Sequence, residues 1–158
     1  MTFIIRHAKS DDVPSILTLI QELAVYEKAA LEVDITNEIL HDDLFGTRKI
    51  IDCQVAEIEN EIAGIAIYYT KYSTWKGRCL YLEDIVVSER FRGSGIGKAL
   101  FKEVINVAKE NNSGRMEWQV LDWNTSAIDF YKAFGAVLDS EWINGKFTKK
   151  QLQEFKFQ

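Results

Sequence analysis

A glycine-rich turn between an apolar stretch and a helical pattern constrains this 158-residue chain more than any other feature. Leu80 to Val87 is rich in β-branched and aromatic residues, as expected of a mostly buried strand. The turn Arg92-Gly93-Ser94-Gly95-Ile96-Gly97 follows it and leads directly into helical spacing from Lys98. Glycines let backbone N–H groups approach a phosphate, and a helix N-terminus favours its negative charge. The sequence therefore predicts an anion-binding site at this turn.

Two common phosphate-binding patterns do not match the turn. The Walker pattern requires Ser or Thr after its lysine, but Ala99 follows Lys98. The dinucleotide pattern requires G-x-G-x-x-G, whereas the glycines here are spaced G-x-G-x-G. The pattern that fits is R-x-x-G-x-G, placed after a strand and before a helix.

Composition and length favour a single packed domain over residues 1–158. Hydrophobic residues make up 47% of the chain and aromatic residues 12%, which is enough for a sizeable core. The net charge of −5 argues against a nucleic-acid partner and suits a cationic substrate. We find no signal-peptide pattern and no apolar run of membrane-spanning length. Because the two cysteines form no disulfide framework, we expect a cytoplasmic protein without a membrane partner.

Strand and helix patterns follow one another along the chain and predict an α/β fold with a mixed sheet. Strands are expected at residues 3–8, 50–57, 61–72, 80–87, 115–121 and 136–143. Helices are expected after Asp12, between the Thr36 cap and Gly46, at 98–111, at 124–134, and from Thr148 to Phe155. The two strands that flank Glu59-Asn60 should form an antiparallel hairpin.

Glu83 and Asp84 are adjacent carboxylates in an otherwise apolar strand. A carboxylate buried in a strand is costly unless it is paired or used. Consecutive strand residues point to opposite faces, so Glu83 shares a face with Tyr81 and Ile85. Glu83 is the better candidate for a base or for the anion that meets a cationic substrate, and the alternative is a structural salt bridge.

Tyr131 lies seven residues after Asn124 in the predicted helix, so both share one face. A phenol at that place is a candidate general acid. The alternative is a tyrosine that only packs in the core.

Six segments, in this order and at these intervals, resemble the Gcn5-related N-acetyltransferases (GNAT), in particular their diamine acetyltransferase branch. They are I-Q-E-L-A-V-Y-E-K, Y-S-T-W-K-G-R, Y-L-E-D-I-V-V, R-G-S-G-I-G, V-L-D-W-N and F-Y-K-A-F-G-A. The resemblance extends from Phe3 to about Phe147. It implies one α/β (α+β) domain whose twisted, mixed and mostly antiparallel sheet is splayed at its middle strands and flanked by helices.

The resemblance also implies an N-acetyltransferase that uses acetyl-CoA and needs no metal. The acceptor would be the primary amine of a small cation, namely a thialysine- or lysine-like amino acid, a diamine or a polyamine, which attacks directly in a ternary complex. The family works as a homodimer. Two alternatives stay open: an enzyme that acetylates protein or peptide amines, and a non-catalytic regulatory module that only binds CoA.

The same resemblance assigns roles to individual residues. Tyr131 would be the general acid on the CoA sulfur, and Glu83 would meet the amine directly or through water. The residues expected to contact the cofactor are Ile85, Val86, Val87, Arg92, Gly93, Ser94, Gly95, Ile96, Gly97, Lys98, Asn124, Thr125, Ser126, Ala127 and Tyr131. The residues expected to line the acceptor site are Tyr26, Glu27, Glu83, Glu117, Trp118, Gln119 and Glu141, the last serving the neighbouring subunit.

Overall fold

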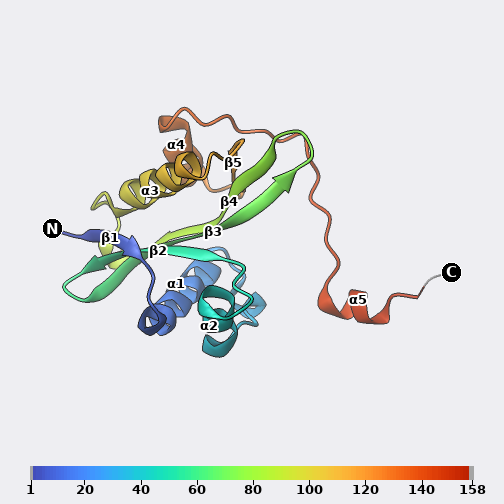
Figure 1. Cartoon of the computed structure of the whole chain (residues 1–158), viewed down its shortest axis with the longest axis horizontal. Coiled ribbons are helices and arrows are strands. Elements are labelled where there is room, and N and C mark those ends of the chain that lie inside the picture. The colour runs from blue at the N-terminus through green and yellow to red at the C-terminus, as the bar shows by residue number, and fades with distance from the viewer. Residues whose placement is uncertain (1, 157–158) are drawn as a thin grey trace. The chain divides into compact units, whose positions relative to one another are not determined.

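Five strands form one sheet within residues 2–156, the part of the chain that this computed structural model describes (Figure 1). They are β1 (Ile4–His7), β2 (Asp52–Ile58), β3 (Glu61–Ser73), β4 (Gly77–Val87) and β5 (Met116–Glu117), in the spatial order β1-β2-β3-β4-β5. The first three pairings are antiparallel, and β4 pairs with β5 in parallel. The predicted mixed, mostly antiparallel sheet is confirmed.

The hairpin between β2 and β3 forms at the residues expected to turn. Glu59 and Asn60 both have positive φ, at 49° and 68°. A two-residue loop with positive φ at both positions matches the right-handed twist of the strands that it joins. This turn sets the pairing of Ile58 with Glu61 and thus the alignment of β2 with β3.

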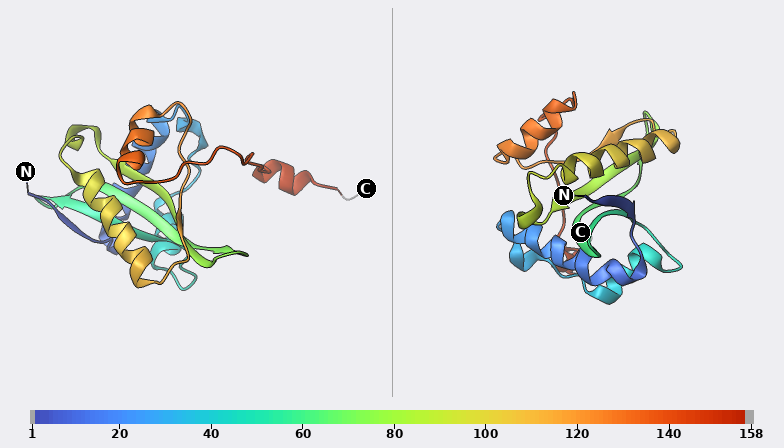
Figure 2. Two further views of the ribbon diagram at one scale, coloured as in Figure 1. Left: turned by 90° about the horizontal axis from the view of Figure 1, so that it is seen from above. Right: turned by 90° about the vertical axis from the view of Figure 1, so that its left-hand side faces the viewer.

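Three helices cover the two faces of the sheet, α1 (Val13–Tyr26) and α2 (Asn37–Phe45) on one and α3 (Ile96–Glu110) on the other (Figure 2). The hydroxyl of Thr36 accepts the N–H of Ile39, and Gly46 N–H bonds to Asp42 O, so α2 has its predicted ends. One core lies under α1 and α2, built from Val13, Ile16, Leu17, Leu19, Leu40, Leu44, Cys53, Val55, Ile62, Ile65, Ile67 and Val86.

The chain divides into two compact units, residues 1–119 and residues 120–158. The first contains the whole sheet with α1, α2 and α3. In the second, α4 (Thr125–Ala133) is followed by a segment without regular structure and by α5 (Lys149–Glu154), which Thr148 caps as predicted. The single domain expected from the sequence stays a prediction.

Two predicted strands differ from those in the structure. The strand expected at residues 115–121 is reduced to Met116–Glu117, because pairing with β4 is restricted to Leu80 and Tyr81. The strand expected at 136–143 is wrong. These residues form no strand and are largely exposed, because β-branched and apolar residues make a strand only beside a partner strand. The helix predicted from Lys98 begins two residues earlier, at Ile96, and β4 begins at Gly77.

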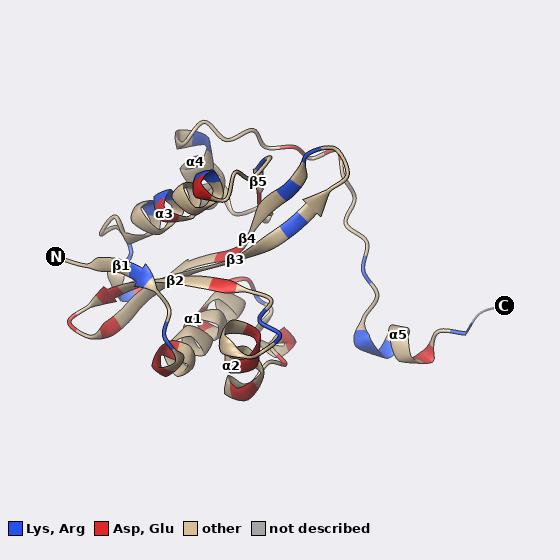
Figure 3. Ribbon diagram, viewed as in Figure 1, with Lys and Arg blue, Asp and Glu red and all other residues tan. Residues whose placement is uncertain are grey.

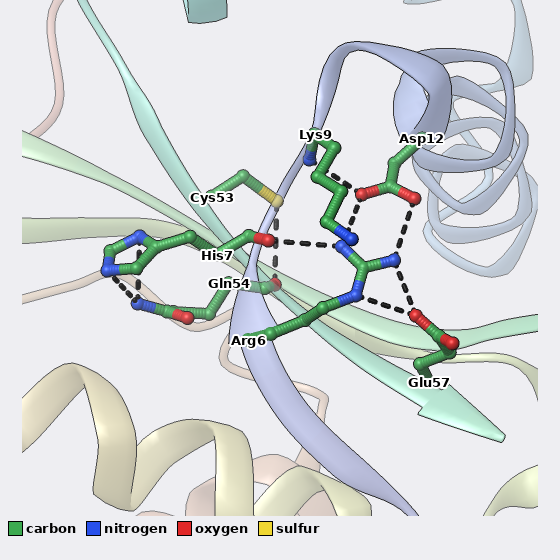
Figure 4. A network of polar contacts seen from close by, with 7 residues as sticks. All are labelled: Arg6, His7, Lys9, Asp12, Cys53, Gln54 and Glu57. Carbon is green, nitrogen blue, oxygen red and sulfur yellow. Dashed lines mark hydrogen bonds and ion pairs between the residues drawn. The ribbon is translucent and has the colours of Figure 1, made fainter. Parts of the chain in front are cut away.

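A half-buried arginine ties the first strand to the start of the first helix (Figure 4). The guanidinium of Arg6 donates to both carboxylate oxygens of Asp12, at 2.6 and 3.0 Å, and to Glu57 of β2 at 2.6 Å. Asp12 also accepts the backbone N–H of Lys9 at 2.7 Å. Burial alone would raise the pKa of Asp12, but the hydrogen bonds from Arg6 and Lys9 outweigh it and lower that pKa.

Substitution Arg6→Met should lower the free energy of unfolding by about 3 kcal/mol at pH 7, since it leaves two carboxylates without their cation. The folded-state pKa of Asp12 is depressed, so its contribution is present above the unfolded-state pKa and is lost as pH falls through the folded-state value. Urea unfolding at pH 7 and pH 3 measures both effects. The control Lys49→Met removes an exposed ion pair with Asp52 and should cost less than about 1 kcal/mol. Equal losses for the two variants would contradict this account.

Candidate active site

The glycine-rich turn has the backbone that a phosphate site requires. Gly93 and Gly95 have φ of 76° and 88°, a region that residues with a Cβ rarely adopt. Nothing lies within 4 Å of the place where a Cβ would stand on either glycine. The turn ends at the N-terminus of α3, whose first residue, Ile96, is buried and anchors it. The open backbone and the helix N-terminus fit a pyrophosphate group.

Arg92 connects this turn to β4 and to the end of α1. Its Nε donates to the carbonyl of Val87 at 3.3 Å, and its guanidinium lies 5.3 Å from the ring centre of Tyr26. Tyr26 and Arg92 both line an open groove of about 990 Å³ between α1, the start of β3 and the segment from Ser88 to Arg92. The structure therefore places Tyr26, predicted to line the acceptor site, beside Arg92 of the glycine-rich turn.

The pairing between β4 and β5 is short, and it lies at the edge of the described sheet, whereas the resemblance implies a splay at the middle strands. Pairing between these strands joins only Leu80 to Met116 and Tyr81 to Glu117. Farther along β4, residues Ile85, Val86 and Val87 pair with β3 on their other side. After β4, Ser88 and the 3₁₀ helix η3 (Glu89–Phe91) lead to the glycine-rich turn. The unpaired edge of residues 85–87 is therefore separated from the turn by only four residues of the chain.

A β-bulge distorts β4 at Glu83. The register joins Ile67 to Asp84 and Tyr68 to Leu82, which leaves Glu83 as the extra residue on β4. Bulges redirect side chains and are frequent beside active sites. Glu83 is exposed, whereas Asp84 is half-buried. The bulge thus presents two consecutive carboxylates within β4.

These two carboxylates and Glu27, at the end of α1, form an acidic cluster. Burial raises the pKa of Asp84 to about 7, and the negative charges of Glu83 and Glu27 add to the effect. Burial also raises the pKa of Glu27. A carboxylate with a pKa near neutrality can accept a proton and release it again. The acidic cluster therefore has the charge to attract a cation and one group suited to proton transfer.

Tyr69 of β3 and Tyr81 of β4 lie between the acidic cluster and the β3–β4 turn. The rings of Tyr69 and Tyr81 lie 5.2 Å apart. Burial raises the pKa of both phenols, and the charge of Glu83 raises it further, with a hydrogen bond between Glu83 and Tyr69. Both rings thus lie next to Glu83 and form an aromatic surface beside the acidic cluster.

The predicted acceptor residues Glu117, Trp118 and Gln119 have different surroundings in the structure. Glu117 is half-buried and pairs with Lys71 at 3.4 Å and with Arg115 at 3.1 Å. The Trp118 ring instead packs edge-on against Phe101 of α3, with centroids 5.4 Å apart. Gln119 is exposed. Of these residues, only Glu117 belongs to the surface that Tyr81 and Lys71 share.

The remaining predicted residues belong to the unit of residues 120–158. Asn124 caps α4, where its side-chain oxygen accepts the N–H of Ala127 at 3.2 Å. Thr125 and Ser126 form the exposed first turn of that helix. Tyr131 is 6% exposed, and its ring lies 5.2 Å from that of Phe130. Glu141 is exposed, and its N–H donates to Asp139.

The sequence pattern does not identify two residues of this region. Strict alternation assigns Asp84 to the opposite face from Glu83, and alternation does not reveal a bulge. Lys71 resembles any charged residue near the solvent-facing end of a strand. The adjacent pair Glu83-Asp84 was the one signal that could have identified Asp84.

Residues 2–156 contain no group of three or more His, Cys, Asp and Glu side chains able to hold a metal ion. No helix there is both long and apolar enough to cross a membrane.

Known proteins resemble this chain in sequence and in fold. The model of the acetyltransferase (GNAT) family matches residues 13–136. Thialysine N-epsilon-acetyltransferase of Bos taurus is 46% identical over 145 residues, which cover 86% of this chain and 85% of that protein. Spermidine/spermine N(1)-acetyltransferase-like protein 1 of Homo sapiens is 35% identical over 95% of this chain and 23% of that protein.

A solved structure shares the fold. An integron cassette protein from the mobile metagenome of V. cholerae has a TM-score of 0.79 and 24% identity, and the match covers 98% of this chain and 97% of that one. The family match spans most of the chain and includes the glycine-rich turn, the bulged strand and α4. The chain belongs to the acetyltransferase (GNAT) family and is an acyltransferase.

Proposed function

We propose that this enzyme transfers the acetyl group of acetyl-CoA to the primary amine of a small cationic acceptor: a lysine-like amino acid, a diamine or a polyamine. The observation that carries the proposal is the acidic cluster on the bulge of β4, the same strand that leads into the phosphate-binding turn. The names of the curated relatives, which include thialysine and spermidine/spermine acetyltransferases, support a small amine as the acceptor.

In this proposal the residues of one strand and one turn hold the cofactor. Backbone N–H groups of residues 92–98 bind the pyrophosphate, and the open edge at residues 85–87 pairs with the pantetheine arm. By the family resemblance, residues 124–127 at the N-terminus of α4 would also bind the cofactor. When bound, acetyl-CoA supplies the thioester that acylates the amine.

The acidic cluster would bind the acceptor and remove its proton. Glu83 holds the ammonium group, and Asp84 takes one proton so that the neutral nitrogen can attack the thioester carbonyl in a ternary complex. The new N–C bond forms as the C–S bond breaks. The Tyr131 hydroxyl would donate a proton to the departing sulfur, and the second proton, which the nitrogen loses as the amide forms, would pass through solvent to the tyrosinate. The proton on Asp84 passes to water, so one proton is released for each acetyl group transferred.

Thiol release from acetyl-CoA tests the reaction directly. With lysine, thialysine, putrescine and spermidine as acceptors, we expect turnover with at least one amine, and Tyr131→Phe should slow it at least about 100-fold. The exposed tyrosine variant Tyr72→Phe is the matched control and should keep full activity. Cofactor binding without turnover for any small amine would contradict the proposal. Acetylation of peptides alone, seen by mass spectrometry, would instead favour a protein acceptor.

A second test separates a functional carboxylate from a structural one. The pKa of Asp84 is raised in the folded protein, so ionisation between about pH 4 and pH 7 costs the folded state stability. Asp84→Asn should therefore raise Tm at pH 8 by at least about 3 °C, and by less at pH 4.5. The same change should lower kcat/KM at least about 100-fold.

The control for this test is Asp129→Asn, which changes an exposed carboxylate of α4. It should leave Tm and kcat/KM nearly unchanged at both pH values. If Asp84→Asn lowered Tm at pH 8, Asp84 would be a stabilising ion-pair partner, and its proposed role would be wrong.

The proposal includes a homodimer in the cytoplasm, in which Glu141 serves the partner's acceptor site. Exposed apolar side chains around it, Val137, Trp142, Ile143 and Phe147, suit coverage by a second copy. The free, buried cysteines Cys53 and Cys79 agree with a reducing compartment.

Sedimentation velocity at micromolar concentration should give the mass of a dimer. The double substitution Trp142→Ser with Ile143→Ser should shift it toward the monomer, because it removes two exposed apolar side chains. Trp75→Ser changes an equally exposed tryptophan on the β3–β4 turn and should leave the dimer intact. A monomeric wild-type protein would contradict this part of the proposal.

A further inference from the structure

A small cationic cluster lies on the half of the sheet nearest the β3–β4 turn. It consists of Lys71, Arg115 and the carboxylate of Glu117 between them, at 3.4 and 3.1 Å. The ammonium of Lys71 also lies 5.2 Å from the ring centre of Tyr81. One carboxylate faces two cations, so the cationic cluster carries a net positive charge.

The cationic cluster and the acidic cluster lie at opposite ends of the pair of rings formed by Tyr69 and Tyr81. Tyr81, under Lys71, is two residues from Glu83 on β4, which corresponds to about 7 Å along a strand. Figure 3 shows the basic residues of β3 and β4 toward their shared turn and acidic residues nearer the middle of the sheet. A ligand lying on Tyr69 and Tyr81 would meet negative charge at one end and positive charge at the other.

Charge balance alone does not explain the presence of Lys71. Arg115 already pairs with Glu117 at the shorter distance, and Lys71 remains 42% exposed. An exposed ion pair of this kind contributes little to stability. A cation at this place would also repel the second amine of a diamine or polyamine acceptor, so it favours an acceptor that carries an anion.

We infer that Lys71, assisted by Arg115, binds the carboxylate of an α-amino acid acceptor whose distal amine lies in the acidic cluster. Glu117 then receives the α-ammonium group, so the three side chains match both charges of the amino acid. Lys71 is thus a specificity-determining residue that favours lysine-like acceptors over diamines. This inference rests on the proposed function, because the acidic cluster must hold the reacting amine.

Lysine and cadaverine provide the test, since they differ only in the carboxylate. Wild-type enzyme should have a kcat/KM for lysine at least about 10-fold above that for cadaverine, as expected for one hydrogen bond to a charged group. Lys71→Met should lower kcat/KM for lysine about 10-fold and raise it for cadaverine, because the repulsion of the second amine disappears. Opposite changes cannot arise from partial unfolding.

Two further variants complete the experiment. Lys71→Arg keeps the charge and should retain the preference for lysine. Lys76→Met removes an exposed lysine of the nearby turn and should leave both values of kcat/KM at the wild-type level.

Each contrary result has a distinct meaning. Equal turnover of lysine and cadaverine by the wild type, or equal losses with both in Lys71→Met, would overturn the role of Lys71 and leave the proposed function intact. Absence of turnover with every amine would overturn the proposed function, and this inference with it.

Discussion

The bulge at Glu83 is the feature on which the candidate site depends. Without the extra residue, β4 would continue its alternation, and Glu83 and Asp84 would project to opposite faces. With it, their charges act on each other and on Glu27, and burial raises the pKa of Asp84 to about 7. Such an arrangement costs stability, because burial and like charges both oppose ionisation. A cost of this kind at the centre of a sheet is typical of a functional site.

The second requirement is the opening between β4 and β5. Their pairing at Leu80 and Tyr81 keeps β5 in the sheet, while residues 85–87, four residues before the glycine-rich turn, pair with β3 alone. The bulge, the open edge and the turn follow one another within β4 and its exit. In the proposed function, this one segment binds the cofactor and, a few residues earlier, the acceptor amine, so the two reacting groups would meet on a single strand.

Local chemistry made much of the fold predictable. Thr36 and Gly46 set the ends of α2, and Glu59-Asn60 set the β2–β3 hairpin, because caps and tight turns depend on neighbouring residues. The expected strand at 136–143 was wrong because strand formation depends on a partner strand, which composition does not specify. The bulge was missed for the same reason, since it depends on how β4 aligns with β3. The role of Lys71 depends on contacts with Glu117 and Tyr81 from two other strands.

The most direct measurement is a crystal structure of the enzyme with CoA and a lysine-like acceptor. We expect the pyrophosphate on backbone N–H groups of residues 92–98, and the acceptor's distal nitrogen within hydrogen-bonding distance of Glu83 or Asp84. A distal nitrogen bound away from both carboxylates, with the pyrophosphate still on the glycine-rich turn, would contradict the claim that the bulged strand serves both substrates.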